Sequence, residues 1–350
     1  MKIVADDKIP YIQPALQALA DEVVFKAGKE ITSSDVRDAD ILVVRTRTCC
    51  DRRLLKNSSV RLVVTATIGY DHFDTKWLEK AGILWANCPG CNATSVAQYV
   101  RNSLFALQQD RDFVLTNATV GIVGVGHVGT AVLHALRQAG VRRILLNDPP
   151  REVASDPAPE SLCWSPIETL QAEADVITLH TPLMMQGAFK TYHLVNAAFF
   201  DSLQRTPVLI NTARGGIVDE VALCHALDNS LIREAIIDTW EHEPQVRRSL
   251  LQKAYLSTPH IAGYSADGKA NATRMALEHI CNFLGQPMTF DIHPPTLPAE
   301  FHLTGTPDEQ ALQLYDPRRD SQQLKMRPES FEQLRGNYPL RREECSFFAH

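Results

Sequence analysis

Three short motifs in the second half of the chain carry side chains suited to acid–base chemistry on an anionic molecule. Arg214 lies in NTARGG, Glu243 in DTWEHEP and His260 in PHIAG. An imidazole exchanges a proton near neutral pH, and a carboxylate beside it favours the protonated form and fixes the ring. A guanidinium makes a forked, charge-assisted contact with a carboxylate. Each residue alone also has an ordinary structural explanation, so the interpretation depends on all three occurring together.

A glycine-rich loop upstream of these motifs predicts a dinucleotide site. Gly124, Gly126 and Gly129 fit the pattern G-x-G-x-x-G directly after an apolar run and at the start of a predicted helix. The first glycine permits a tight turn, the second lets a pyrophosphate approach, and the third lets helix and strand pack closely. The backbone amides of this helix start, including those of His127 and Val128, would face the anion.

Asp148 bears on which dinucleotide binds. It lies roughly 20 residues after Gly129, at the end of the next predicted strand. A carboxylate there accepts hydrogen bonds from the ribose hydroxyls and repels a 2′-phosphate, which favours NAD. The nearby Arg151 keeps NADP open as an alternative. A glycine loop without any ligand is the structural alternative, and the well-placed acid argues against it.

Together these residues suit hydride removal from a 2-hydroxy acid. That oxidation needs a base for the hydroxyl proton, a cation that holds the carboxylate, and a nicotinamide ring against C2. His260 suits the first task and Arg214 the second, while Glu243 assists the imidazole.

The elements that must position these residues form two alternating α/β units. Apolar runs separated by helices predict parallel sheets covered on both faces. Each reactive motif begins at or just after a predicted strand, and the carboxyl ends of parallel strands border a common crevice. Long connecting helices are predicted from residue 95 and over residues 267–284. The predicted strands cover residues 2–5, 40–44, 61–66 and 83–86, and then 120–123, 143–147, 175–179, 208–211, 235–238 and 255–257.

Composition restricts the class of protein further. A chain of 350 residues with 45% hydrophobic and 22% charged residues indicates a globular protein of two or three domains. The net charge of −6 gives no reason to expect nucleic-acid or membrane binding. No signal peptide or spanning segment is evident, and eight cysteines without a disulfide framework favour the cytoplasm. Cys88 and Cys91 have redox-pair spacing, but a turn before a helix is the favoured interpretation, and no metal is expected.

The quoted motifs resemble the D-isomer-specific 2-hydroxyacid dehydrogenase family over roughly residues 40–285. The resemblance implies that Arg214 binds substrate and that His260, assisted by Glu243, is the proton donor and acceptor. It also implies a discontinuous substrate-binding domain over 1–94 and 264–285, and a Rossmann NAD-binding domain over 95–263. The cofactor contacts that motif and resemblance give are Gly124, Gly126, His127, Val128, Gly129, Asp148, Thr181, Thr212, Ala213, Arg214, Asp238 and Gly263.

Within the family, the resemblance extends to members with an additional C-terminal domain, and the segments 315–320 and 331–342 carry much of it. It implies a small α+β dimerisation domain over 286–350, and therefore a homodimer. The implied reaction is NAD-dependent oxidation of 4-phospho-D-erythronate to (R)-3-hydroxy-2-oxo-4-phosphooxybutanoate, in the biosynthesis of pyridoxal 5′-phosphate (vitamin B6). Thr46, Thr67 and Tyr264 match positions that contact substrate.

Two alternatives stay open. The chain could act on another D-2-hydroxy acid, such as 3-phosphoglycerate or glycerate, although the C-terminal segment argues against this. It could also be a non-catalytic NAD(H)-sensing protein, which would not need a polar substrate pocket near Thr46 and Tyr264. Gln98, where the resemblance suggests glutamate, is a departure, and Thr46 and Ile68 differ slightly from the pattern.

Overall fold

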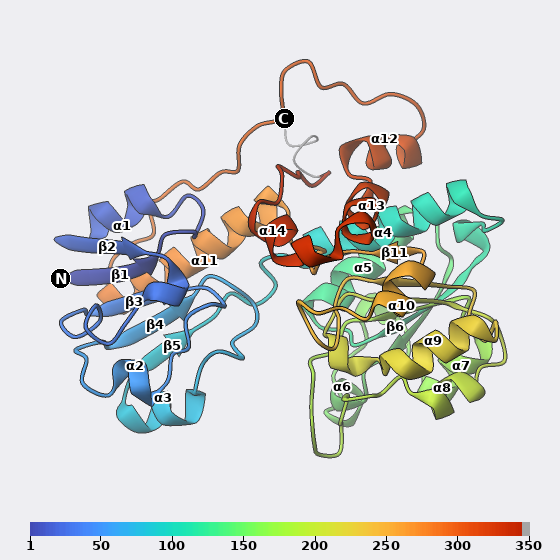
Figure 1. Ribbon diagram of the computed structural model, residues 1–350, viewed down its shortest axis with the longest axis horizontal. Coiled ribbons are helices and arrows are strands. Elements are labelled where there is room, and N and C mark those ends of the chain that lie inside the picture. The colour runs from blue at the N-terminus through green and yellow to red at the C-terminus, as the bar shows by residue number, and fades with distance from the viewer. Residues whose placement is uncertain (345–350) are drawn as a thin grey trace. The chain divides into compact units, whose positions relative to one another are not determined.

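The computed structural model describes residues 1–344, and the chain divides into two compact units (Figure 1). Unit 1 comprises residues 1–92 and 266–298, and unit 2 comprises residues 93–265 with the C-terminal segment from residue 299. Unit 1 is therefore discontinuous in sequence. Residues 286–298 belong with unit 1 and the chain from residue 299 with unit 2, and a dimerisation domain over 286–350 stays a prediction.

Unit 1 is built on a five-stranded parallel sheet in the order β2-β1-β3-β4-β5. The central strands consist of buried apolar residues because both faces of the sheet are covered. Helix α11 (Ala266–Leu284) packs on one face through Ala276, Leu277 and Ile280, which share a core with the sheet. The strands are β1 (Lys2–Asp6), β2 (Glu22–Lys26), β3 (Ile41–Val44), β4 (Leu62–Thr65) and β5 (Leu84–Ala86), and the other helices are α1 (Gln13–Leu19), α2 (Arg52–Leu55) and α3 (Thr75–Ala81).

Unit 2 contains a six-stranded parallel sheet in the order β11-β10-β9-β8-β6-β7. The two predicted parallel sheets are thus confirmed. The strands are β6 (Thr119–Val123), β7 (Arg143–Asn147), β8 (Val176–Leu179), β9 (Val208–Asn211), β10 (Glu234–Ile237) and β11 (Leu256–Ser257). The helices before the C-terminal segment are α4 (Ala93–Asp110), α5 (His127–Gln138), α6 (Pro149–Val153), α7 (Ile167–Glu173), α8 (Ala197–Asp201), α9 (Glu220–Asp228) and α10 (Arg248–Lys253).

Helix α4 is buried on nearly all sides, because α5 packs against it and helices of the C-terminal segment cover it as well. Several of its buried polar residues form hydrogen bonds with that segment. Asn102, for example, donates from Nδ2 to the backbone oxygens of Ala311 (2.9 Å) and Tyr315 (2.7 Å). Such bonds offset the cost of burying an amide side chain, so α4 and the C-terminal segment form one packed structure.

The C-terminal segment, expected from the sequence to be α+β, is helical in its described part, which contains no strand up to residue 344. It forms α12 (Pro307–Leu314), α13 (Pro317–Met326) and α14 (Phe331–Gly336). Its prolines do not mark irregular chain. Pro307 and Pro317 occupy first turns, where the missing N–H costs nothing, behind the capping residues Thr306 and Asp316.

The structure also describes the environment of the Cys88–Cys91 pair and the character of the helices. Cys88 is buried and donates from Sγ to the backbone oxygens of Thr65 and Ala272, both at 3.3 Å, and burial raises the pKa of its thiol. Cys88 and Cys91 do not form a disulfide bond. In addition, none of the helices within residues 1–344 combines the length and apolar character needed to cross a membrane.

Candidate active site

The three reactive motifs lie side by side at the carboxyl edge of the unit 2 sheet. Arg214 follows β9, Glu243 lies in the loop after β10, and His260 follows β11. These strands are direct neighbours in the order β11-β10-β9. The topology therefore brings together residues that are far apart in the sequence.

His260 and Glu243 are joined by hydrogen bonds. Nδ1 of His260 lies 2.8 Å from Oε2 and 3.0 Å from Oε1 of Glu243, and the Trp240 amide also donates to Oε1 at 3.0 Å. Burial raises the pKa of Glu243, but the bond to His260, its charge, the Trp240 amide and Arg335 together outweigh burial and leave this pKa lowered. Glu243 is therefore ionised at neutral pH and holds Nδ1, which leaves Nε2 of the imidazole for proton exchange.

The backbone of His260 is held in an uncommon conformation. Its φ of +57° lies in the left-handed region, which residues other than glycine rarely adopt. The His260 amide donates to the backbone oxygen of Asp238 at 2.8 Å. Oδ1 of Asp238 accepts from the Ile261 amide (2.8 Å) and Oδ2 from the Ala262 amide (3.0 Å). Local strain of this kind persists only where surrounding contacts hold it.

Asp238 thus stabilises the conformation of the His260 loop by hydrogen bonds to its amides. The side chain is 1% exposed, and burial raises the pKa of its carboxyl against the opposing effects of His260 and the hydrogen bonds it accepts. Oδ1 also accepts from Oγ1 of Thr258 at 2.6 Å. A contact between Asp238 and the cofactor stays a prediction, and the structure adds this positioning contact.

Arg214 is brought against the Glu243 loop by the glycine that follows it. A Cβ atom on Gly215 would overlap the Trp240 carbonyl, so only glycine permits this approach of the two loops. Asn211 fixes the turn from inside, since its Nδ2 donates to the Arg214 backbone oxygen at 3.0 Å and its Oδ1 accepts from the Ala213 amide at 3.1 Å. The guanidinium contacts the Ala213 backbone oxygen through Nη1 at 2.8 Å.

The glycine loop has the geometry that its sequence predicts. Gly124 has φ +86°, and a Cβ there would lie 2.8 Å from the Thr181 amide nitrogen, while a Cβ on Gly129 would overlap the Gly124 oxygen. The space beside Gly126, by contrast, is open. Gly126 is the N-cap of α5 and caps it with no side chain, so the amides of the first turn, including those of His127 and Val128, present donors to an anion.

The acidic residue of this site contacts the loop itself. Oδ2 of Asp148 accepts from the Val125 amide at 2.7 Å, and the residue is half-buried after β7. Arg151 donates from Nη1 to the Val125 oxygen at 2.7 Å, and its guanidinium lies 5.3 Å from the Trp164 ring. The two charged groups thus flank the same loop.

Further polar groups beside the loop fit a dinucleotide. Oγ1 of Thr181 is buried and has no hydrogen-bond partner among the described residues. The His180 ring lies between Oγ1 of Thr178 (2.9 Å) and Oγ1 of Thr212 (3.3 Å), and desolvation of the ring lowers its pKa to about 3, so the ring is neutral. A buried hydroxyl without a partner calls for an acceptor or donor from a ligand. Open space, exposed amides and this hydroxyl together fit NAD.

The remaining predicted contacts lie in both units. In unit 1, Thr46 is exposed after β3 and Thr67 follows the neighbouring β4, where its Oγ1 lies 2.6 Å from Oγ1 of Thr65. In unit 2, Gly263 and Tyr264 are half-buried in the turn that follows His260, and the Tyr264 amide donates to the Ile261 oxygen at 2.9 Å.

The C-terminal segment contributes residues that the sequence motifs did not identify. Arg341 is fully buried beneath the His260 loop and donates from Nη1 to the backbone oxygens of Ile261 (3.3 Å) and Ala262 (3.1 Å). Its Nε donates to Oε1 of Gln98 at 2.9 Å and its Nη2 to the Ser95 oxygen at 2.6 Å. Gln98 is therefore an acceptor for this guanidinium. No local motif marks Arg341, because its partners lie far away in the sequence.

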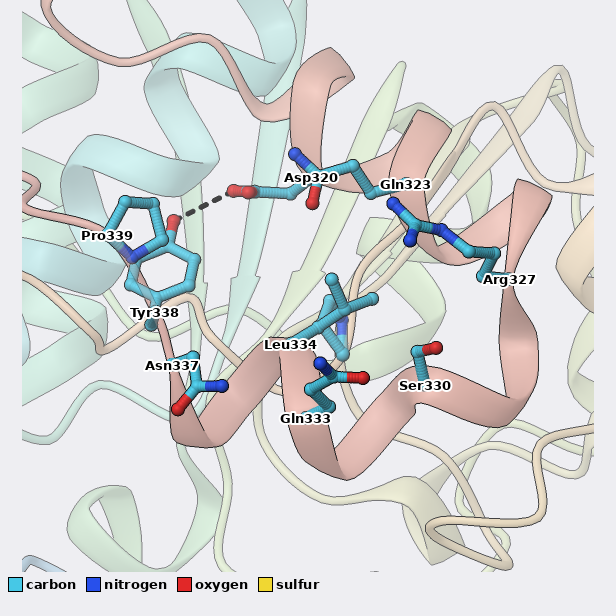
Figure 2. Close-up of a pocket in the computed structure, with 10 residues that line it drawn as sticks. Asp320, Gln323, Arg327, Ser330, Gln333, Leu334, Asn337, Tyr338 and Pro339 are labelled. Atoms are coloured by element: carbon cyan, nitrogen blue, oxygen red, sulfur yellow. Dashed lines mark hydrogen bonds between the residues drawn. The ribbon is translucent and has the colours of Figure 1, made fainter.

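A cavity of about 170 Å³ lies beside this region, between α13, α14 and Pro259 (Figure 2). On one side, Asp320 accepts from the hydroxyls of Tyr338 (2.8 Å) and Tyr315 (3.1 Å), and burial raises the pKa of its carboxyl. None of the three reactive residues lines the cavity. It is therefore separate from the acid–base site.

Comparison with known proteins shows the family of this chain. The family described as D-isomer specific 2-hydroxyacid dehydrogenase, NAD binding domain, matches residues 91–262. A protein of Bacteroides fragilis (strain YCH46) is 49% identical over 347 residues, which cover 99% of this chain and 98% of the relative. The chain therefore belongs to the D-isomer specific 2-hydroxyacid dehydrogenase family, and it is an NAD-dependent oxidoreductase acting on a CH–OH group of a small hydroxy acid.

Full-length relatives of the chain carry a more particular name. The Bacteroides fragilis protein is named erythronate-4-phosphate dehydrogenase. A protein of the same name from Edwardsiella ictaluri (strain 93-146) is 40% identical, over 99% of this chain and 94% of its own. Among solved structures, D-lactate dehydrogenase from Aquifex aeolicus, complexed with NAD and lactic acid, has a TM-score of 0.63 at 21% identity, over 81% of this chain and 96% of that one. This last likeness concerns the fold.

Proposed function

We propose that the chain oxidises 4-phospho-D-erythronate to (R)-3-hydroxy-2-oxo-4-phosphooxybutanoate with NAD, a step toward pyridoxal 5′-phosphate. The observation that carries the chemistry is the His260–Glu243 pair, with the Arg214 loop packed against it on the same sheet edge. Support for the particular substrate comes from the full-length relatives and the name they bear.

In this proposal His260 is the general base. Its Nε2 takes the proton of the C2 hydroxyl, and Glu243, which holds Nδ1, stabilises the imidazolium that forms. Arg214 holds the substrate carboxylate in a forked contact and polarises the C2–O bond. NAD, when bound, supplies the acceptor for the C2 hydride. Gly124, Gly126 and Gly129, with Asp148, Thr181, Thr212, Ala213, Asp238 and Gly263, are the residues that would hold it.

The wider organisation belongs to the same proposal. Thr46, Thr67 and Tyr264 contact the substrate, the two parts of unit 1 form the substrate-binding domain, and the protein works in the cytoplasm. It is a homodimer, formed through the C-terminal segment. The exposed apolar side chains of Met326 (62%) and Leu340 (46%) on this segment support such an interface.

The test is a steady-state assay of the purified protein. NADH formation is followed with 4-phospho-D-erythronate, 3-phosphoglycerate and glycerate. We expect kcat/KM to be greatest for 4-phospho-D-erythronate. A clear preference for 3-phosphoglycerate or glycerate would assign the chain to another reaction of the family, and NAD binding without turnover of any acid would make it a sensing protein.

A further inference from the structure

One arginine of the C-terminal segment lies next to the active-site loop. Arg335, on α14, donates from Nη2 to the Tyr264 hydroxyl at 3.1 Å. Its guanidinium carbon lies 5.7 Å from the centre of the Tyr264 ring and 5.9 Å from that of Phe331. These contacts hold the Arg335 guanidinium against Tyr264. Tyr264 lies four residues downstream of His260 and is already expected to contact substrate.

The hydrogen bonding of Arg335 is incomplete. Its Nε is buried and has no hydrogen-bond partner within residues 1–344. The acid paired with it, Glu332, lies 3.9 Å from Nη1 and is 42% exposed, so this ion pair is weak. Buried donors are nearly always satisfied in native structures. The Arg335 side chain is only 18% exposed, and its Nε–H donor has no acceptor among the described residues. We infer that an anionic ligand supplies this acceptor.

The charge of Arg335 also acts on the acid–base pair. Among the groups that offset the burial of Glu243 and keep its pKa low, Arg335 is the one that comes from the C-terminal segment. The guanidinium therefore lies within electrostatic reach of the site where the hydroxy acid reacts. In unit 1, Arg45 directly precedes Thr46, but its Nε is paired with the buried Asp6 at 3.3 Å.

We propose that Arg335 binds the terminal phosphate of the substrate while Arg214 holds its carboxylate. This inference rests on the proposed function. Nε of Arg335 would donate to a phosphate oxygen, and the Tyr264 hydroxyl, which accepts from Nη2, would donate its own proton to the same anion. Guanidinium groups suit phosphate because their N–H donors match its oxygens. The C-terminal segment would thereby determine which hydroxy acid is accepted.

The experiment compares two substrates that differ only in the phosphate. Values of kcat/KM are measured for 4-phospho-D-erythronate and D-erythronate with the wild type, Arg335→Gln and Arg335→Lys. Where turnover of D-erythronate is too slow to follow, its Ki as a competitive inhibitor replaces kcat/KM. We expect Arg335→Gln to reduce the preference for the phosphorylated acid about 10- to 100-fold, mainly through KM, as for loss of a charge-assisted hydrogen bond. Arg335→Lys should recover part of it.

The control is Arg319→Gln, which removes an exposed arginine from α13 of the same segment and should change neither value. NAD binding, followed by fluorescence, shows whether each variant is folded, and if Arg335→Gln does not fold, Arg335→Lys decides. An equal loss for both acids, or an unchanged preference, overturns the inference while leaving the proposed function standing. If the wild type prefers 3-phosphoglycerate, the proposed function fails, and the same comparison with glycerate still decides the role of Arg335. A wild type that prefers an acid without phosphate overturns both.

Discussion

At the scale of single residues, the contact between His260 and Glu243 prepares the imidazole for proton transfer. Glu243 lies 2.8 Å from Nδ1 and fixes the ring, so that Nε2 is the nitrogen that takes the hydroxyl proton. The pKa of Glu243 is lowered, so its carboxylate carries the charge that stabilises the imidazolium formed in the reaction.

We therefore expect Glu243→Gln to lower kcat for oxidation about 10- to 100-fold, as for loss of a charge-assisted hydrogen bond, because the imidazolium that forms loses its stabilising carboxylate. The measurement is kcat and kcat/KM for oxidation at saturating NAD, with NAD binding as the check that the variant is folded. An unchanged kcat in the folded variant would show that Glu243 does not assist the base.

The residue types themselves were predictable from sequence, because Arg214, Glu243 and His260 each lie in a short contiguous motif after a strand. Arg335 and Arg341 were not, because they act across contacts with residues more than 70 positions away. Nothing in their local sequence distinguishes them from solvated arginines. The role of Gln98 was equally hidden until its partner, Arg341, was known.

At the scale of elements, the central strands were predicted well and the edge of the first sheet was missed. Strand β2 begins and ends with charged residues and is only partly buried, so it shows no continuous apolar run. It pairs with β1 alone, at the edge of the sheet. The helices of the C-terminal segment were missed for a different reason, since their prolines resemble those of irregular chain until capping residues place them at helix starts.

The contact between this segment and the His260 loop leads to a prediction about positioning. We expect Arg341→Gln to lower kcat about 10- to 100-fold, because the loop loses the cation that holds two of its carbonyl groups, and small misplacements of a reacting group are costly. NAD affinity should change little, and Arg341→Lys should restore part of kcat.

The measurement is kcat, KM and NAD binding at equal concentrations of folded protein. Thermal unfolding checks that each variant is folded. Arg248→Gln, which changes an exposed arginine at the start of α10, is the control and should match the wild type. If kcat is retained in folded Arg341→Gln, the segment does not position the histidine.

At the scale of the whole molecule, the proposed homodimer leads to a prediction about mass in solution. We expect light scattering to give a mass of twice the 39.0 kDa of one chain. Leu340→Glu, which puts a charge on the proposed interface, should shift the protein toward the mass of a single chain. Val153→Glu, at a more exposed apolar position on α6, should not. A wild type that elutes as a single chain at micromolar concentration would exclude the homodimer.

The turn that carries His260 has a further consequence for how this protein can be inhibited. Its amides donate to Asp238, which follows β10, and its carbonyls accept from Arg341, which belongs to the C-terminal segment. A compound that displaces the C-terminal segment would remove the Arg341 contacts. It would stop turnover without competing with either substrate, and its potency would not fall as substrate accumulates.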